Sequence, residues 1–454
     1  MSTRRASGWP SRPSSTPTTR SPRRTCTSWR GSRRLCGRTD EEDRRRRRGI
    51  RRPASGPRLE GLLRPGEVEL TLLDRNNYHL FTPLLYQVAT GELPPHAVAY
   101  PLRLPIAHMR QRFVETDVEG VDLERRSVRT ADGDFTYDHL VLVPGSVTND
   151  FGIPGVAQHA LATKTLADGM MVRKRILETV ENAARETDAE RRKALLSFVI
   201  IGAGPVGVEL AASLRDLMDH SLRRMYPELD LARDAKITLV DAGDRVLLAM
   251  DERLAHIAMT QLAKQRVTVV LKTFVSEVGE GIVRTKDGKQ FRGGTIVWAG
   301  GVRAHPLIAG LAGVTLAKDK RLVVDRTFRA DGRDDLLSFG DAAFFEYQGK
   351  PLPQLAQVAV LEAPAVARNL AHLVRGEQLE PYVYKRKGDL VALGRTHAGA
   401  ELAKYGHVVL SGLPAWTVWR VNYLTQLLGV RNRASLLLEW ILSYFFTRIV
   451  ADTP

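Results

Sequence analysis

Short apolar runs rich in Val, Ile and Leu recur from about residue 65 to residue 300 of this chain. Such runs are typical of strands that are buried on both faces of a parallel sheet. They lie at Val68–Leu73, His139–Val143, Ser197–Ile201, Lys236–Val240, Val267–Leu271 and Thr295–Trp298. Apolar positions with a helical period lie between some of these runs, at Ala167–Ala184 and Val206–Met218. Strands that alternate with helices predict an α/β fold built on parallel sheets.

One of these runs leads directly into a glycine-rich turn that is followed by a helical pattern. The glycines are Gly202, Gly204 and Gly207. The first glycine permits a tight turn, the second lets the backbone approach a pyrophosphate, and the third lets the helix pack closely on the strand. The helix N-terminus would face the anion. The motif predicts a dinucleotide site, and its context disfavours the alternative of a plain glycine turn.

An acidic residue should follow the next strand and hold the ribose hydroxyls, and Asp241 occupies that place. It lies further downstream than the usual spacing of about 20 residues. We expect the extra residues, which include Tyr226, to lengthen the intervening helix and loop. An acid here favours NAD over NADP because it repels a 2′-phosphate, although Arg245 is close in sequence. Glu209 lies just inside the helix, where it either reaches the nicotinamide end of the cofactor or only stabilises the helix N-terminus.

A second strand followed by an acid occurs far upstream, where Val68–Leu73 leads into Asp74. No glycine turn precedes this strand, so only one of two expected phosphate-binding turns is intact. The first 60 residues instead contain 18 Arg, no Lys and 5 acidic residues, and hold +13 of the net charge of +16. The remainder of the chain is close to neutral, and we therefore predict no nucleic-acid partner.

Three interpretations of the arginine-rich tail are open: a solvated basic tail, a targeting peptide, or a stretch that is not the natural reading frame of the gene. A targeting peptide is disfavoured because no apolar segment follows and the run Asp40–Asp43 is acidic. Arg without Lys, together with Pro, Ser, Gly and Trp, is a composition that an out-of-frame reading of GC-rich DNA tends to give. Both cysteines, Cys26 and Cys36, lie in this tail. The body therefore has no structural disulfide, no redox-active cysteine pair and no cysteine-ligated metal, and we predict no metal site.

The segment from Trp416 onward has bulky apolar residues flanked by Arg, Trp and Tyr. This pattern predicts amphipathic helices that lie in a membrane interface. The alternative is a helix pair docked on the protein body or on a second subunit, as in a homodimer. No uncharged apolar stretch reaches the length of about 20 residues that a spanning helix needs.

The stretch Asp74–Gly91 resembles the segment that follows the FAD ribose acid in type II NADH dehydrogenases. The likeness continues through Tyr137–Gly145, the glycine turn, Thr295–Gly301 and Leu336–Ala343, and covers roughly residues 66–454. These proteins are single-subunit, membrane-associated NADH:quinone oxidoreductases. The resemblance implies two Rossmann-like dinucleotide-binding domains, one for FAD and one for NAD, with a C-terminal membrane-association region.

The resemblance also assigns site residues. It implies cofactor contacts at Asp74, Gly145, Gly202, Gly204, Gly207, Asp241, Gly300, Gly340, Asp341 and Ala342. Asp341 would hold the ribityl or pyrophosphate part of FAD. Glu209 and Gln357 are the candidate catalytic residues. The family's quinone motif pairs two glutamines, of which Gln357 is present while Leu361 replaces the second.

The implied organisation is a tail at 1–64, an FAD-binding domain at 65–160 and 301–375, an NAD-binding domain at 161–300, and a membrane-association region at 376–454. The expected partners are NADH, a lipid quinone and a membrane surface, with the protein peripheral on the cytoplasmic face of the cell membrane. Two alternatives stay open. One is an NAD(P)H-dependent flavin oxidoreductase with a non-quinone acceptor, and the other is an inactive homologue that cannot hold FAD.

Overall fold

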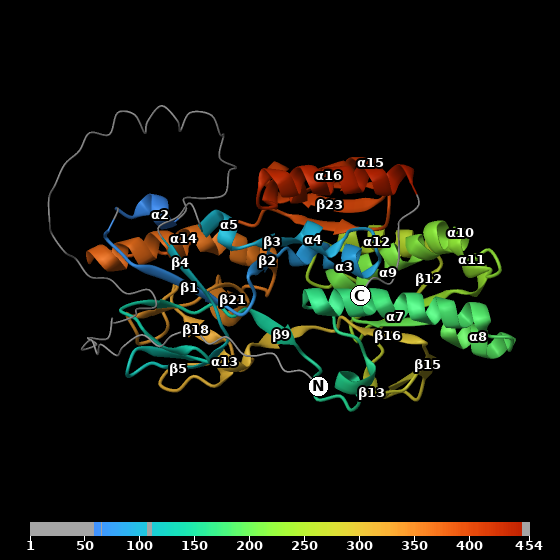
Figure 1. Cartoon of the computed structure of the whole chain (residues 1–454), viewed down its shortest axis with the longest axis horizontal. Helices are drawn as coiled ribbons and strands as arrows, with labels where there is room; N and C mark the ends of the chain where they lie inside the picture. The colour runs from blue at the N-terminus through green and yellow to red at the C-terminus, as the bar shows by residue number, and fades with distance from the viewer. Residues whose placement is uncertain (1–58, 65, 107–110, 447–454) are drawn as a thin grey trace, which may run out of the picture.

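The computed structural model describes residues 59–64, 66–106 and 111–446. The described residues form two α/β units that lie side by side, with a third module of strands and two helices above them (Figure 1). The predicted α/β class with parallel sheets is confirmed, and the predicted helices are present with shifts of one or two residues at their ends.

The middle unit is built on a four-stranded parallel sheet in the order β12-β11-β10-β16. Its strands are β10 (Ser197–Ile201), β11 (Lys236–Val240), β12 (Val267–Val270) and β16 (Thr295–Trp298). All residues of β16 are buried, as are four of the five in β10 and in β11. Burial on both faces explains why these strands read as continuous apolar runs and were predicted almost to the residue.

Helices α7 (Leu166–Arg185), α9 (Pro205–Asp216) and α12 (Glu252–Lys264) share one buried apolar core with this sheet. The start of α7 is fixed by a capping box, in which Thr165 Oγ1 accepts from the N–H of Asp168 and the Asp168 carboxylate accepts from the N–H of Thr165. After α9 the chain continues as a π-helical turn at Leu217–Leu222 and a short α10 (Arg223–Met225). This insertion accounts for the long spacing before Asp241, as predicted.

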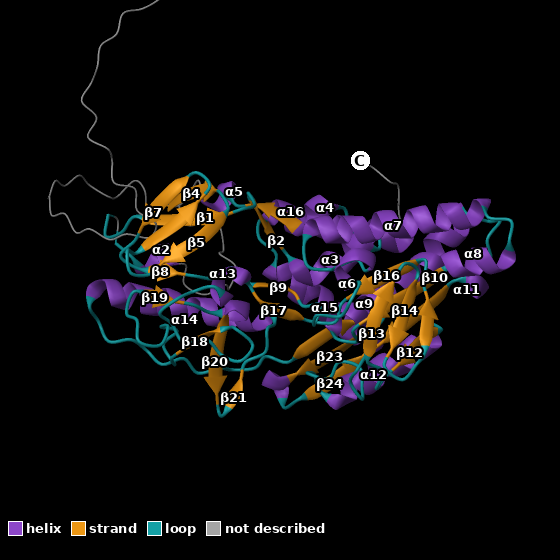
Figure 2. Ribbon diagram, turned by 90° about the horizontal axis from the view of Figure 1, so that it is seen from below, coloured by secondary structure: helices purple, strands orange, loops and turns teal. Residues whose placement is uncertain are grey.

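The N-terminal unit contains two short parallel pairs. β1 (Leu70–Asp74) pairs with β4 (Gln111–Glu115), and β8 (Leu140–Val141) pairs with β19 (Leu336–Leu337). Leu73 of β1 and Val114 of β4 pack against the buried cluster that contains Leu140 and Leu337. Figure 2 shows both pairs on the same side of the molecule. β8 contains only Leu140–Val141, so the strand predicted at His139–Val143 is shorter than expected.

Several small elements surround these pairs. One antiparallel sheet consists of β5 (Val118–Asp122), β6 (Ser127–Thr130) and β7 (Gly133–Thr136). In a second sheet, β20 (Ala343–Tyr347) pairs antiparallel with β21 (Lys350–Pro351) and parallel with β18 (Leu322–Val324). The two units are joined where β9 (Ser146–Thr148) pairs with β17 (Val302–Ala304). The long helix α14 (Ala356–Arg375) packs against α2 (Leu59–Leu62).

The C-terminal module consists of an antiparallel sheet and two helices. Its elements are β22 (Asp389–Ala392), β23 (Ala398–Leu402), β24 (Val408–Ser411), α15 (Gly412–Gln426) and α16 (Val430–Phe445). Trp419 and Trp440 are buried with ring centroids 5.8 Å apart, and the Trp440 indole N–H donates to Gln87 Oε1 of α3 (Leu85–Ala89) at 3.0 Å. These contacts hold the inner faces of both helices on the body.

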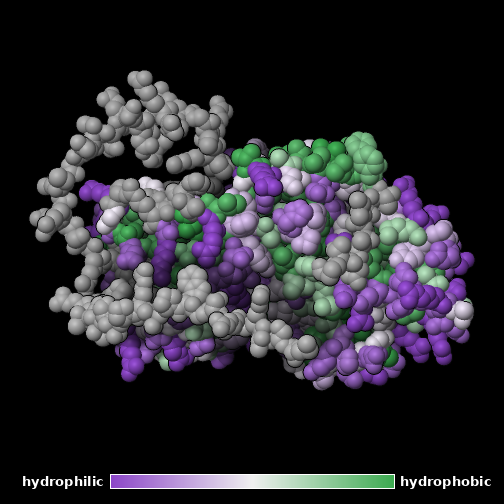
Figure 3. All heavy atoms as spheres, viewed as in Figure 1, coloured by the Kyte–Doolittle hydropathy of each residue, from purple (hydrophilic) through white to green (hydrophobic). Residues whose placement is uncertain are grey.

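The outer surface over α15 and α16 is hydrophobic (Figure 3). Its exposed apolar side chains are Leu413, Val421, Val430, Leu437, Leu438, Ile441, Leu442, Phe445 and Phe446. Across the ranges that the structure describes, no helix combines the length and the apolar character needed to span a bilayer.

Candidate functional site

A cavity of about 870 Å³ lies where the middle unit, the N-terminal unit and α15 meet. This volume is in the range of small-molecule and cofactor sites. Most of the predicted site residues line it, namely Gly145, Gly202, Gly204, Glu209, Asp241, Gly300, Gly340, Asp341 and Gln357. Asp74, Gly207 and Ala342 lie outside the lining set.

The glycine turn between β10 and α9 has the geometry that its sequence predicts. Gly202 has φ +109°, a backbone conformation that favours glycine, and a Cβ there would lie 2.4 Å from the carbonyl oxygen of Ala299. A Cβ at Gly207 would lie 1.8 Å from the carbonyl oxygen of Gly202, so the helix can start against the turn only with glycine at this position. At Gly204, the N-cap of α9, no side chain of a described residue caps the helix. The helix N-terminus therefore remains available to an anion.

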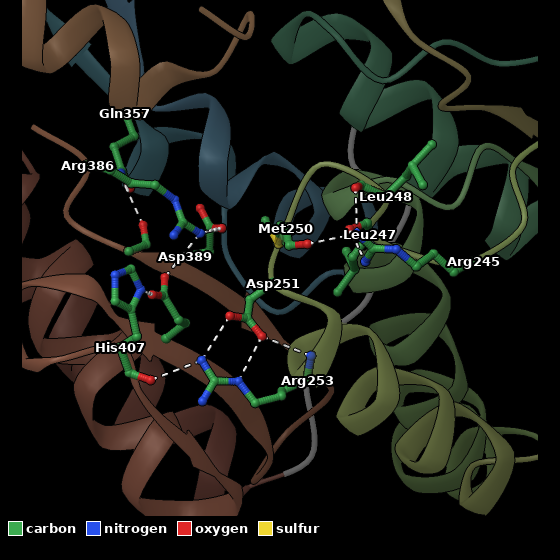
Figure 4. A network of polar contacts seen from close by, with 12 residues as sticks. Arg245, Leu247, Leu248, Met250, Asp251, Arg253, Gln357, Arg386, Asp389 and His407 are labelled. Carbon is green, nitrogen blue, oxygen red and sulfur yellow. Dashed lines mark hydrogen bonds and ion pairs between the residues drawn. The ribbon is translucent and has the colours of Figure 1, made fainter. Parts of the chain in front are cut away.

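Asp241 ties the end of β11 to this turn. Its carboxylate accepts from the backbone N–H of Ala203 at 2.5 Å and from that of Gly243 at 2.6 Å. Arg245 turns toward its own loop, where its guanidinium donates to the carbonyl oxygens of Leu247, Leu248 and Met250 (Figure 4). Both oxygens of the acid thus bind backbone N–H groups of the turn and of its own loop, while the neighbouring cation is occupied by backbone carbonyls.

Glu209 is buried between α9 and the C-terminal module. Its Oε1 accepts from the backbone N–H of Ala392 at 2.9 Å, and its side chain lines the cavity. Burial raises the pKa of this carboxyl to about 8. The pKa of nearby Tyr423 is also raised, by burial first and by the Glu209 charge second. At neutral pH the Glu209 carboxyl is therefore mostly protonated and can donate or accept a proton inside the cavity.

The turn at Gly340–Asp341 is held by a polar cluster from three segments. Ser146 Oγ donates to Asp341 Oδ2 at 2.5 Å, and Lys164 Nζ lies 2.7 Å from Ser146 Oγ and 3.4 Å from Asp341 Oδ2. The N–H of Gly340 donates to Glu362 Oε2 at 2.7 Å, and burial raises the pKa of that carboxyl to about 7. Lys164 also lines the cavity. Sequence reasoning missed Ser146, Lys164 and Glu362, because nothing in their local patterns marks them and only the fold brings them together.

Gln357 lies at the start of α14, where its Nε2 donates to the carbonyl oxygen of Gly388 at 3.0 Å. Leu361, the position where the glutamine pair is broken, is not among the lining residues.

Beside Gln357, Arg386 forms ion pairs with Asp389 and, at 3.1 Å, with Glu401 (Figure 4). This group belongs to a larger network that joins the C-terminal sheet to α12, in which Arg253 donates to the carbonyl oxygen of His407 at 3.0 Å.

Asp74 ends β1 and accepts from the backbone N–H of Asn76 at 2.8 Å, while burial raises the pKa of its carboxyl. A ribose-binding carboxylate and a turn for the remainder of the cofactor are the groups that an FAD molecule would need from Asp74 and Gly340–Asp341. Within the described ranges, however, no strand leads through a glycine turn into a helix ahead of β1, so the residues described fit an FAD only in part.

Comparisons with known proteins agree on one protein family. Residues 59–363 match the family described as pyridine nucleotide-disulphide oxidoreductase, and residues 386–449 match the NDH2 C-terminal domain. The chain is similar to the type II NADH:quinone oxidoreductase Ndh of Mycobacterium tuberculosis, with 32% identity over 408 residues that cover 85% of each chain. It is also 27% identical to the external alternative NADH-ubiquinone oxidoreductase of Yarrowia lipolytica mitochondria, over 83% of this chain and 75% of that protein.

Among solved structures, NDH2 from Plasmodium falciparum in complex with NADH superimposes with a TM-score of 0.77 at 19% identity. The superposition covers 85% of this chain and 95% of that one. At this identity the likeness concerns the fold.

Proposed function

This chain belongs to the type II NADH:quinone oxidoreductase family, and we propose that the cavity described above is where it passes electrons from NADH through FAD to a membrane quinone. The single observation that carries the proposal is the convergence of three elements on one cavity: the glycine turn at Gly202–Gly204, the Gly340–Asp341 turn, and Gln357. This convergence supports the proposal, because a two-electron carrier requires contiguous sites for its donor, its redox cofactor and its acceptor.

NADH is assigned to the glycine turn, with Gly202, Gly204 and Gly207 at the pyrophosphate and Asp241 at the ribose. The hydrogen bonds of Arg245 to three backbone carbonyls support NADH over NADPH, because this guanidinium is the nearby cation that a 2′-phosphate would need. Gly300 follows β16 and lies directly beside the turn, since a Cβ on Gly202 would be 2.7 Å from its Cα.

FAD is assigned to Asp74, Gly145, Gly340, Asp341 and Ala342, in the unit formed by residues 65–160 and 301–375. Flavin chemistry supplies the two-electron transfer when this cofactor is bound. The cluster of Ser146 and Lys164 fixes the Asp341 carboxylate and places a cation at the cavity wall. Glu209 holds a proton close to the site, which the reduction of a quinone consumes.

The quinone is assigned to the part of the cavity lined by Gln357. Membrane association is assigned to residues 376–454. The exposed apolar side chains of α15 and α16 support peripheral attachment to the cytoplasmic face of the cell membrane, because their inner faces are already packed on the body. A homodimer that covers the same surface is the competing assignment.

The test is to supply the purified chain with FAD and to measure NADH oxidation with a water-soluble quinone analogue. We expect quinone-dependent oxidation, and NADH in preference to NADPH. Turnover with a protein acceptor such as a ferredoxin, and none with quinones, would instead support the alternative of a flavin oxidoreductase with a non-quinone acceptor, for which Leu361 is the supporting residue.

A further inference from the structure

Two acidic side chains lie side by side in the C-terminal sheet. Asp389 of β22 and Glu401 of β23 are direct partners in the antiparallel register, so both side chains leave the same face of the sheet. Both are buried, and Asp389 lines the cavity. Because like charges at a cross-strand pair repel each other, a pair of this kind needs a cation beside it or a proton on one of its carboxylates.

Arg386 supplies the cation. Its Nη2 contacts Asp389 Oδ2 and also lies 3.1 Å from Glu401 Oε2. Two oxygens that are held on one nitrogen are close enough for a single water to bridge them. An arginine guanidinium does not lose its proton in proteins. Arg386 therefore positions the two carboxylates but carries no proton between them.

His407 connects this pair of carboxylates to solvent. Its Nδ1 lies 2.6 Å from Glu401 Oε1, and its side chain is 60% exposed. Figure 4 shows the His407 ring in one cluster with Arg386 and Asp389. Imidazole is the side chain that exchanges protons with water near neutral pH. The cluster thus has one end in solvent and the other end in the wall of the cavity.

The other charged or titratable groups that face this cluster in the described ranges are Asp251 and Arg253 of α12 and Tyr384 of the loop before β22. The two α12 residues pair with each other at 2.9 Å. Burial raises the pKa of Asp389, the contact with Arg386 opposes this shift, and the charges of Glu401 and Asp251 add to it. A raised pKa suits a carboxyl that takes up and releases a proton in each turnover.

Quinone reduction takes one proton from solvent in every turnover. The quinol gains two electrons and two protons, and the hydride of NADH supplies both electrons and one of the protons. Glu209 holds a proton in the cavity, but it is buried, and the N–H of Ala392 to which it is bonded cannot replace that proton. Once Glu209 has given up its proton, another group must bring the next one from the surface.

We propose that His407, Glu401 and Asp389 carry to the cavity the proton that quinone reduction takes from solvent. His407 gains a proton from water at Nε2 and gives the proton on Nδ1 to Glu401 Oε1. Glu401 passes a proton through one water to Asp389, which releases it to the quinone oxygen. Only N–H and O–H bonds form and break along this route, and no electron moves through it.

This inference rests on the proposed function, which assigns the quinone to the part of the cavity lined by Gln357. The position of Gln357 supports the connection. Its Nε2 donates to the carbonyl oxygen of Gly388, the residue directly before Asp389. The inner end of the proton route and the residue assigned to the quinone are therefore joined by a hydrogen bond of 3.0 Å.

The first test is the variant His407→Gln, because this side chain is exposed and its replacement leaves the buried groups in place. In full-length protein supplied with FAD, at alkaline pH, we expect kcat with a water-soluble quinone analogue to fall at least about fivefold and the KM for NADH to stay the same. Turnover with ferricyanide, which takes electrons without protons, should not change. Imidazole in the buffer should restore at least about half of the quinone turnover, because it delivers protons in place of the missing ring.

Two further variants complete this test. His256→Gln replaces an exposed histidine of the neighbouring helix α12 and should behave like the unsubstituted protein. Asp389→Asn should lower quinone turnover as His407→Gln does, but imidazole should not restore it, because the blocked step lies inside the protein.

A second measurement needs neither NADH nor a quinone. After a light-induced drop in pH, time-resolved infrared absorption follows the carbonyl band of protonated carboxyls, and the part that is absent from Asp389→Asn belongs to Asp389. We expect this part to appear at least about tenfold more slowly in His407→Gln than in the unsubstituted protein.

The outcomes separate this inference from the proposed function. If His407→Gln lowers quinone and ferricyanide turnover equally, or lowers neither, the proton route fails and the function stands. An infrared rate that does not depend on His407 also overturns the route. If the unsubstituted protein reduces no quinone but its infrared rate depends on His407, the proton route into the cavity stands and the proposed function fails.

Discussion

The Glu209 carboxyl and the backbone N–H of Ala392 form a hydrogen bond of 2.9 Å that joins the first turns of α9 to the last residue of β22. Because α9 begins at the glycine turn, this bond connects the nucleotide-binding unit to the C-terminal module inside the cavity. Burial raises the pKa of this carboxyl to about 8.

Replacing Glu209 with Gln should therefore alter the pH dependence of turnover. The amide oxygen can still accept from Ala392, but the proton that titrates with a pKa of about 8 is lost. In FAD-supplied protein we expect the pH profile of quinone reduction to lose its inflection near pH 8, while the Kd for NADH stays the same. An unchanged profile would assign Glu209 a structural role only.

The same substitution should change stability in a defined direction. The pKa of Glu209 in the folded protein is about 8, above its ordinary value of 4.5, so the folded state binds more protons than the unfolded state between these values. The free energy of unfolding should fall as the pH rises from about 4.5 to about 8. Denaturant titrations should show a smaller fall in E209Q, while the remaining fall includes the contribution of Glu362, whose pKa is also raised.

Asp241→Asn should weaken NADH binding, because Asn has a single accepting oxygen and its amide nitrogen cannot accept, so one of the two N–H groups of Ala203 and Gly243 loses its partner. We expect the Kd for NADH to rise about tenfold, which corresponds to about 1.4 kcal/mol. Asp244→Asn is the matched control, since this exposed acid lies three residues further along the same loop. Equal effects of the two substitutions would contradict the role of Asp241 as the anchor of the turn.

Lys164→Met should reduce the affinity for FAD. The substitution removes the cation that lies against Ser146 and Asp341 and keeps the length of the side chain. We expect the variant to bind FAD at least about threefold more weakly than the unsubstituted protein, whereas Lys174→Met, at an exposed position of α7, should have no effect. Equilibrium dialysis with FAD measures both variants.

The hydrophobic surface of α15 and α16 should bind lipid. Leu438 and Ile441 are 55% and 47% exposed, and a double substitution with Asp should abolish co-sedimentation with anionic phospholipid vesicles. NADH binding should be unaffected. Phe274→Asp changes an equally exposed apolar residue on the middle unit and should leave vesicle binding intact. Loss of a dimer in the double variant, without loss of vesicle binding, would assign this surface to subunit contact.

The sequence predicts the middle unit well for a physical reason. Strands β10, β11 and β16 are buried on both faces, so each appears as an apolar run, and the glycines of the turn are required by contacts as short as 1.8 Å for any added Cβ. The polar residues around Asp341 could not be predicted in this way. Ser146, Lys164 and Glu362 are distant in sequence, and each stands in a local pattern that would suit an ordinary surface or helix residue. The strand at His139–Val143 is shortened for a different reason. In the described residues, β8 pairs with a neighbouring strand along one edge only.

The hydrogen bond from Trp440 to Gln87 gives the C-terminal helices a thermodynamic role beyond attachment. Gln87 follows Tyr86, which lines the cavity, so α16 and the cavity wall share a buried connection. On the proposed membrane attachment, a bilayer that shifts α16 would change the binding free energy of ligands in the cavity through this connection, and by reciprocity those ligands would change the affinity for the bilayer. Membrane binding and substrate binding are then linked equilibria rather than separate properties of two surfaces.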